Sequence, residues 1–180
     1  GHTLIEYGCG TGRIAREAAR RCGRVIAIDI SPAMLAYAED RASAEGIDNM
    51  TFVQSGFLNY RHEGPPADVA LSQLALHHLP DFWKLVALKN ICGALREGGK
   101  LFLKDVVFSL DVDRYASTID YTIRHVAETA GEEMARGYRD HIQKEFSTYD
   151  WIMEEMLYRA GFTIEYADYR DDFIAVYLCS

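Results

Sequence analysis

Residues 6–12 read EYGCGTG. The first two of them end a short apolar run, Thr3–Tyr7, and a segment with helical spacing of apolar residues comes next. Glycine adopts backbone conformations that other residues avoid, so glycines at positions 8, 10 and 12 let the chain turn sharply out of a strand and approach a ligand closely. The helix that follows presents free N–H groups and the positive end of its dipole. This segment therefore predicts a site for the carboxylate or phosphate of a cofactor.

Strands and helices alternate along the first part of the chain. Apolar and β-branched runs predict strands at Thr3–Tyr7, Arg24–Asp29, Met50–Gln54, Asp68–Ser72 and Lys100–Val107. Helical spacing predicts helices over 13–22 and 32–45, and a third from position 81 to before Gly98. This order at this spacing is typical of an α/β fold with a parallel sheet and right-handed connections.

The alternation changes after Phe108. Two helical stripes occupy an insertion at about 109–148, and a last helix is expected at about Thr148–Ala160. Strands near Phe162–Tyr169 and Phe173–Cys179 then close the chain, joined by a tight turn at 170–172. Such a turn makes these two strands antiparallel neighbours.

Asp29 closes the second strand, 21 residues after Gly8. A carboxylate at this place can accept hydrogen bonds from the vicinal hydroxyls of a ribose. Alternatively, Asp29 is a polar strand end that caps the helix beginning after Ser31. Together with the glycine turn, we interpret it as a ribose ligand.

The glycine pattern distinguishes two kinds of adenosyl cofactor. The dinucleotide fingerprint G-x-G-x-x-G requires glycine at position 13, which is arginine here. An acidic residue followed by G-x-G-x-G resembles motif I of the class I S-adenosylmethionine (SAM)-dependent methyltransferases. The segments IDISPAML (28–35), DVALSQLALHHL (68–79) and LREGGKLFLKD (95–105) follow in that family's order. The resemblance extends from Thr3 to Cys179 and is strongest to bacterial small-molecule methyltransferases with an L-H-H segment.

The resemblance implies a Rossmann-like seven-stranded sheet of order 3-2-1-4-5-7-6, with the last strand antiparallel and helices on both faces. It implies one methyltransferase domain over 1–180. The insertion at about 109–148 is expected to be a substrate lid, because it overlies the strand ends where ligands of such folds bind. Relatives carry helical structure before the first strand, so we expect a segment to be missing before Gly1. The implied cofactor is SAM.

The resemblance also assigns the cofactor contacts by position. The implied residues approach the methionyl end, the ribose or the adenine of SAM: Glu6, Gly8, Cys9, Gly10, Asp29, Ile30, Met34, Gly56, Phe57, Gln73 and Leu74. Many relatives carry an aspartate after the third strand that reads the adenine amino group. Here residues 54–57 read QSGF, so backbone groups and Phe57 are expected to replace it.

Methyl transfer needs alignment and exclusion of water more than it needs stabilisation of a new charge. Such positioning supplies up to about 7–11 kcal/mol of the barrier in the best cases. A base, worth about 10²–10⁴-fold, is needed only when the acceptor must lose a proton. His77 and His78 are the candidates, the alternative being that they simply begin the next helix.

The acceptor is predicted to be a small molecule. Enzymes that methylate amino groups of bases or glutamine commonly place N/D-P-P-Y after the fourth strand, where residues 72–75 read SQLA. The insertion offers aromatic and histidine side chains that predict an aromatic-lined cavity, or else helix packing: Tyr115, Tyr121, His125, Tyr138, His141, Phe146 and Tyr149. No metal site is expected, because His125, Asp140 and His141 lack a further fixed ligand.

Composition excludes several classes of partner. Nineteen lysines and arginines against 27 acidic residues give a net charge of −8, and no basic run predicts binding to nucleic acid. No apolar run reaches the roughly 18 residues of a membrane span, and no leader peptide is evident, so we expect a cytoplasmic protein with reduced cysteines. An NAD(P)-dependent oxidoreductase and a non-catalytic SAM-binding module are the alternative functions.

Overall fold

Eight strands form the central sheet of the computed structural model, which describes residues 1–180. They are β1 (Thr3–Tyr7), β2 (Arg24–Asp29), β3 (Met50–Gln54), β4 (Ala67–Gln73), β5 (Leu95–Phe108), β6 (Thr148–Tyr149), β7 (Ile164–Arg170) and β8 (Ile174–Cys179). Their order is β3-β2-β1-β4-β5-β8-β7, with β6 paired to β5 outside this path. Strands β1 to β5 are parallel to one another, and β8 runs antiparallel to β5 and β7.

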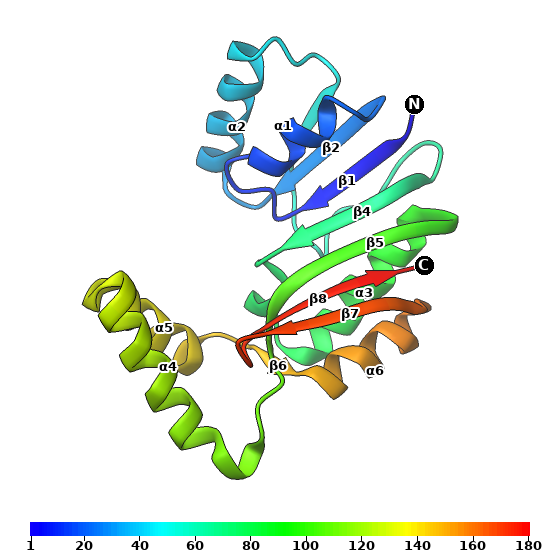
Figure 1. Cartoon of the computed structure of the whole chain (residues 1–180). Coiled ribbons are helices and arrows are strands. Elements are labelled where there is room, and N and C mark those ends of the chain that lie inside the picture. Colours follow the sequence, from blue (N-terminus) through cyan, green and yellow to red (C-terminus); the bar gives the residue numbers. More distant parts are fainter.

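Six α-helices and two short 3-10 helices connect the strands (Figure 1). The α-helices are α1 (Arg13–Ala19), α2 (Pro32–Ala44), α3 (Asp81–Ala94), α4 (Tyr115–Ala130), α5 (Glu132–Lys144) and α6 (Asp150–Ala160). The 3-10 helices are η1 (Leu76–His78) and η2 (Val112–Arg114).

The Rossmann-like fold and the seven-strand order predicted from the sequence are confirmed, with one strand more than expected. The additional strand, β6, consists of two residues that the sequence assigned to the start of the last helix. Thr148 pairs with Val107 at the end of β5, so α6 begins only at Asp150. This pairing depends on a contact between distant segments, which local sequence does not reveal.

Two predicted boundaries also differ. Helix α1 ends at Ala19 rather than at Cys22, because the N–H groups of Arg21 and Cys22 both donate to the carbonyl of Ala18 and close the helix with a turn. Strand β5 begins at Leu95, five residues before the predicted Lys100, because Leu95 already pairs with Ala67 across an irregular register.

Alternation along the strands divides the core into two layers. In β1, Leu4 packs with α1 and α2, whereas Ile5 and Tyr7 pack with the layer that contains α3 and α6. Strand β2 repeats the pattern with Val25 on one face and Ile26 on the other. Successive side chains point to opposite faces of a strand, so these nearly continuous apolar runs serve a sheet covered on both sides.

The β7–β8 hairpin turns through Asp171 and Asp172, whose φ angles are 54° and 61°. Two successive left-handed residues match the right-handed twist of the flanking strands, and aspartate tolerates this conformation better than most residues. The predicted antiparallel pair is confirmed by the register from Ile164 to Cys179.

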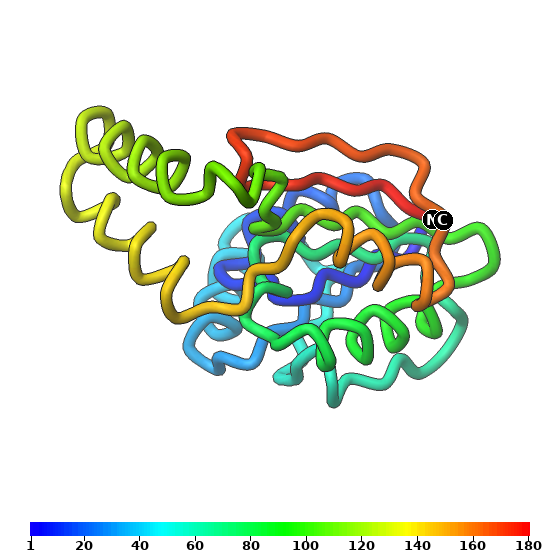
Figure 2. The backbone as a smooth tube through the Cα atoms, turned by 90° about the horizontal axis from the view of Figure 1, so that it is seen from below, coloured from blue at the N-terminus to red at the C-terminus, as the bar shows by residue number.

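Helices α4 and α5 form a helical insertion that projects away from the sheet (Figures 1 and 2). The segment that follows α5 is fixed to the rest of the domain, because the Phe146 N–H donates to the His77 carbonyl at 2.9 Å. The fully buried Lys84 ammonium on α3 contacts the Phe146 carbonyl and the Asp81 carboxylate. These contacts hold residues 145–148 against the end of the sheet.

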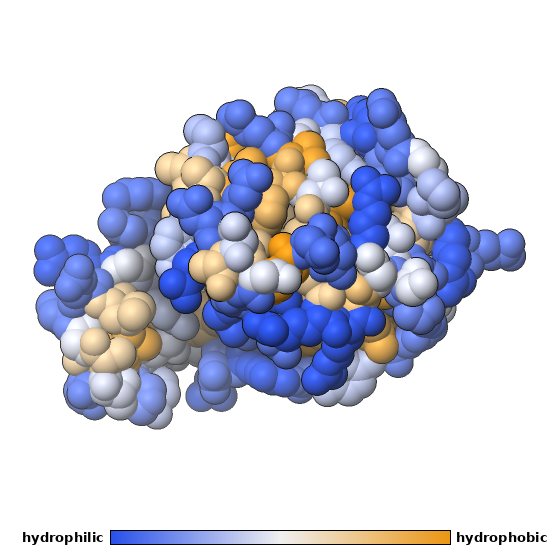
Figure 3. Space-filling view, turned by 90° about the horizontal axis from the view of Figure 1, so that it is seen from above, coloured by the Kyte–Doolittle hydropathy of each residue, from blue (hydrophilic) through white to orange (hydrophobic).

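The face of the molecule seen in Figure 3 is largely hydrophilic, in keeping with the net charge. Apolar side chains gather in the middle of the face seen in that view, and the helical insertion projects to one side. None of the helices is both long and apolar enough to cross a membrane.

Candidate functional site

A cavity of about 550 Å³ opens at the carboxyl ends of β1, β2, β3 and β4. The strand order reverses between β1 and β4, and open α/β sheets bind ligands at such a switch point. The lining residues are Gly8, Gly10, Asp29, Ile30, Ser31, Met34, Ser55, Gly56, Phe57, Leu58, Asn59, Leu74, Ala75, His78 and Leu79.

The glycine turn forms one wall of this cavity. The N–H groups of Gly8 and Cys9 both donate to the Ile28 carbonyl at 2.9 Å, which ties the turn to the neighbouring strand β2. Gly8, Gly10 and Gly12 all have positive φ, between 51° and 72°. Residues with a side chain rarely adopt this conformation, so the turn requires glycine at the three positions where the sequence has it.

The Asp29 carboxylate lies beside the turn. Its Oδ2 accepts from the Gly10 N–H at 2.7 Å, and its Oδ1 accepts from the Ser31 N–H at 2.9 Å. Each carboxylate oxygen can accept a second hydrogen bond, so a ligand hydroxyl can still be bound. Asp29 thus both holds the loop and lies on the cavity wall, and its role as a ribose ligand stays a prediction.

Apolar side chains around the cavity are unusually exposed. Ile30 is 74% exposed, and Met34 and Leu74 are 44% and 41% exposed. On another wall, the Phe57 ring stacks on Tyr7 with a centroid distance of 5.7 Å and an interplanar angle of 11°. Exposed apolar groups around a concave site are typical of a surface that a ligand covers.

Eight of the eleven residues predicted to bind the cofactor lie on the cavity wall, and three do not. Glu6, Cys9 and Gln73 are absent from the lining, and Glu6 and Cys9 are buried. The prediction missed further lining residues: Ser31, Ser55, Leu58, Asn59, Ala75 and Leu79. They lie in loops and short turns after the strands, where no periodic pattern marks a side chain as facing a ligand.

Glu6 is a buried carboxyl with one oxygen, Oε2, that has no hydrogen-bond partner. Burial raises its pKa to about 7, against lesser opposing effects of the Ala15 backbone and Arg13. Removing a carboxylate from water penalises its charged form, so this carboxyl stays protonated to a higher pH than an exposed glutamate does. A cation close to this carboxyl would favour ionisation.

This raised pKa predicts how stability depends on pH. Because the folded-state pKa of about 7 exceeds the ordinary glutamate value of 4.5, the folded chain binds more protons than the unfolded chain between these pH values. The contribution of Glu6 to stability is therefore present below pH 4.5 and lost as pH rises through 7. Relative to Glu6→Gln, the unaltered chain should lose stability between pH 5 and pH 8 in urea unfolding.

The matched control for this experiment is Glu17→Gln, which changes an exposed glutamate on α1. It should follow the pH dependence of the unaltered chain. Parallel pH profiles for Glu6→Gln and the unaltered chain would contradict the raised pKa.

The two histidines proposed as bases occupy different environments. His78 lines the cavity and its side chain is 61% exposed, whereas His77 is buried and does not line it. The His77 Nδ1 contacts the fully buried Asp105 carboxylate, and its Nε2 lies 3.1 Å from Glu145. A role of either histidine as a base stays a prediction.

A second cavity of about 260 Å³ lies between the helical insertion and the sheet. Its lining is mostly apolar: Leu74, Val106, Gly137, Tyr138, His141, Ile142, Phe173 and Ile174. Of the aromatic and histidine side chains singled out in the insertion, Tyr138 and His141 face this space, while Tyr115 and Tyr121 are exposed. Leu74 lines both cavities and has a positive φ of 52°, a strained conformation for a leucine.

A model of a family described as a methyltransferase domain matches residues 4–99, which include the glycine turn, Asp29 and the whole of β4. The chain belongs to the methyltransferase domain family. The expected membership of the class I SAM-dependent methyltransferases is confirmed, and with it the expectation of an enzyme that uses SAM.

Relatives and solved structures agree with this family. An uncharacterized methyltransferase of Geobacillus kaustophilus is 26% identical over 170 residues, which cover 93% of this methyltransferase and 72% of that relative. The SAM-dependent methyltransferase of Mesorhizobium loti superposes with a TM-score of 0.72 at 17% identity, covering 99% and 90% of the two chains. Magnesium protoporphyrin IX methyltransferase of Synechocystis with bound SAM superposes with a TM-score of 0.68 at 15% identity, covering 99% and 69%.

Proposed function

We propose that this chain transfers the methyl group of SAM to a small-molecule acceptor. The observation that carries the proposal is the cavity beside the glycine turn, in which the Asp29 carboxylate lies next to a wall of backbone and apolar surface. Its volume of about 550 Å³ lies within the usual range of sites for small molecules and cofactors.

The parts of SAM match the chemistry of the cavity walls. We place the ribose hydroxyls at Asp29 and the adenine among the exposed Ile30, Met34 and Phe57. The methionyl end then lies along Gly8 and Gly10, toward Leu74. Glu6, beneath the turn, supports this end as a nearby negative charge rather than as a direct contact.

The acceptor is proposed to occupy the second cavity. Because Leu74 belongs to both walls, a molecule there approaches the cofactor from the side opposite its adenine. A lining of aliphatic and aromatic side chains favours a small, largely apolar acceptor. The helical insertion contributes four residues to the lining of this cavity, and we infer that it acts as a substrate lid: Gly137, Tyr138, His141 and Ile142.

Methyl transfer from SAM does not require a charged protein group at the reacting atoms. The sulfonium supplies an activated methyl group, and an acceptor atom attacks it in line. Residues of the two cavities hold the reactants in alignment and exclude water, effects that together are worth up to about 7–11 kcal/mol. No protein group needs to form a covalent bond.

The direct test is to supply SAM together with a panel of small phenols, amines, thiols and carboxylic acids. We expect S-adenosylhomocysteine to form with at least one apolar acceptor class. Tight binding of SAM without product from any class would instead indicate a non-catalytic SAM-binding module.

The placement of the acceptor is tested by Gly137→Leu. A side chain at Gly137 meets no atom within 4 Å at its Cβ, so leucine can extend into the second cavity without disturbing the fold. Helix α5 should gain stability, because glycine within a helix costs roughly 0.5–1 kcal/mol relative to alanine. We expect KM for the acceptor to rise and the affinity for SAM to stay unchanged.

The control is Arg136→Leu, which adds the same side chain at the neighbouring exposed position of α5. It should leave KM for the acceptor unaltered. Equal kinetics for Gly137→Leu and the unaltered enzyme would show that the acceptor binds elsewhere.

A further inference from the structure

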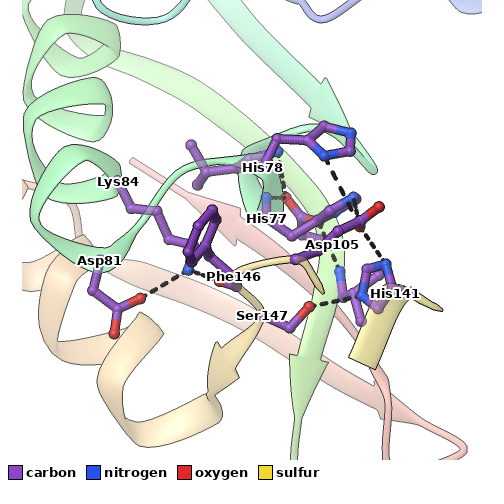
Figure 4. A network of polar contacts seen from close by, with 11 residues as sticks. His77, His78, Asp81, Lys84, Asp105, His141, Phe146 and Ser147 are labelled. Carbon is purple, nitrogen blue, oxygen red and sulfur yellow. Dashed lines mark hydrogen bonds and ion pairs between the residues drawn. The ribbon is translucent and has the colours of Figure 1, made fainter. Parts of the chain in front are cut away.

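Several side chains of types that can bind metals meet where the helical insertion returns to the sheet (Figure 4). His77 and His78 come from η1, and Glu145 directly follows α5. Glu145 Oε2 lies 3.1 Å from His77 Nε2 and 3.9 Å from His78 Nδ1. The three ligand atoms all lie within 4.8 Å of one another.

Asp105 fixes the orientation of the His77 ring. It is fully buried, and its oxygens accept from the N–H groups of Leu76 at 2.8 Å, His77 at 3.2 Å and Val106 at 2.7 Å. A carboxylate that accepts from three N–H groups acts as an acceptor toward the contacting Nδ1 as well, so that nitrogen carries the proton. In the neutral ring with this tautomer, the lone pair of His77 Nε2 faces Glu145.

Glu145 is held in place by its neighbours in the chain. The next residue, Phe146, donates its N–H to the His77 carbonyl and contacts the Lys84 ammonium through its own carbonyl. Glu145 Oε2 is buried, and ring nitrogens of His77, His78 and His141 lie around it. A carboxylate oxygen therefore lies 3.1 Å from His77 Nε2, and in the neutral form of the ring these two acceptors need a cation between them, either a proton or a metal ion.

His141 adds a further donor on the same side. Its Nε2 is hydrogen-bonded to the Ser147 hydroxyl at 2.8 Å, and its Nδ1 contacts Glu145. The His141 ring centroid lies 4.8 Å from that of His77. Two histidines of this cluster thus have one nitrogen held by a hydrogen-bond partner and the other turned toward Glu145, as metal-binding histidines do.

We propose that His77, His78 and Glu145 bind a divalent transition metal of the zinc class, with His141 as an additional ligand. Bonds of about 2.0–2.1 Å in a tetrahedral site place ligand atoms roughly 3.3 Å apart. The two distances from Glu145, 3.1 and 3.9 Å, lie on either side of this value, and all three ligand atoms are within 4.8 Å of one another. Imidazole and carboxylate ligands suit zinc, and the exposed side of His78 offers a path of entry. The site differs from the excluded set of His125, Asp140 and His141, in which Asp140 pairs with Lys144.

A metal at this place would join the helical insertion to the sheet beside the large cavity. His78 also lines that cavity, so a metal on its Nδ1 would exclude the role of general base predicted for this residue. The inference does not depend on the identity of the methyl acceptor, and its test needs no turnover.

The test is calorimetric titration of Zn²⁺ into the chelator-treated full chain, with visible absorption of bound Co²⁺ as a second readout. We expect one metal ion per chain and the intense absorption bands of tetrahedral Co²⁺. Glu145→Gln removes the charged ligand and should weaken binding by at least about 100-fold, because even outer partners of such sites are worth about 10–100-fold. Ser147→Ala, which frees His141, should weaken it by about 10-fold.

The matched control is His125→Ala, which removes a histidine from α4 of the same insertion and should leave Zn²⁺ affinity unchanged. Circular dichroism of each variant checks that the chain remains folded. The proposal is overturned if the unaltered chain takes up no Zn²⁺, or if Glu145→Gln binds it as tightly as the unaltered chain. The cluster would then be an ion-pair contact in which a proton alone lies between His77 and Glu145.

Discussion

Replacing Gly8 with alanine is expected to lower the free energy of unfolding by about 2–5 kcal/mol and to abolish tight binding of SAM. Gly8 has a φ of 72°, and a left-handed conformation costs an alanine roughly 1–2 kcal/mol. A Cβ at this position would also lie 2.5 Å from the Ala75 Cβ, so the turn and η1 must move apart, at about 1–3 kcal/mol for overpacking. Both residues line the large cavity, and urea unfolding with SAM titration measures both effects.

Two further variants separate backbone strain from overpacking. Gly10→Ala has the same strain with a φ of 51°, but its Cβ meets no atom within 4 Å, so it should lose only about 1–2 kcal/mol. In the double variant Gly8→Ala with Ala75→Gly, the opposing Cβ is gone and the overpacking part should be recovered. Equal losses for Gly8→Ala and Gly10→Ala would show that the turn does not pack closely against Ala75.

Asp29→Ala is expected to reduce the affinity for SAM by about 1.5–3 kcal/mol, or roughly 10–150-fold. The carboxylate is the acidic group on the cavity wall, and it accepts from the Gly10 and Ser31 N–H groups. Its loss removes the proposed acceptor of the ribose hydroxyls and releases the glycine turn. Titration calorimetry with SAM gives the change in affinity.

Asp29→Asn keeps the shape and one acceptor oxygen, so its loss of affinity should be smaller than that of the alanine variant. Asp40→Ala, an exposed aspartate on α2, is the control for removing one negative charge and should bind SAM normally. Unchanged affinity in Asp29→Ala would mean that the ribose is held by another group.

Strands and turns with strong local signals could be located from the sequence alone. The bounds of β1, β2 and β3 agree with the predicted ranges, because each is a short apolar run that ends at glycine or polar residues. Strand β6 could not be predicted, since Thr148 and Tyr149 become a strand only by pairing with the end of β5. Pairing between distant segments leaves no periodic pattern in so short a piece of chain.

Some residues of the candidate site could likewise be predicted from the sequence, and others could not. The glycine turn and Asp29 were found because their conformation and charge are unusual at the ends of strands. The contact of Asp105 with His77 spans 28 residues, and Glu145 reaches the cluster only through the return of the helical insertion. No spacing in the sequence indicates that these groups meet, so the acidic partners of His77 emerged only from the fold.

The central claim is that the glycine turn and Asp29 bind one molecule of SAM between them. A crystal structure of the chain with S-adenosylhomocysteine tests it most directly. The account predicts ribose hydroxyls within hydrogen-bonding distance of Asp29 and an adenine packed against Ile30, Met34 and Phe57. A ligand bound elsewhere, or one in this cavity whose ribose makes no contact with Asp29, would contradict it.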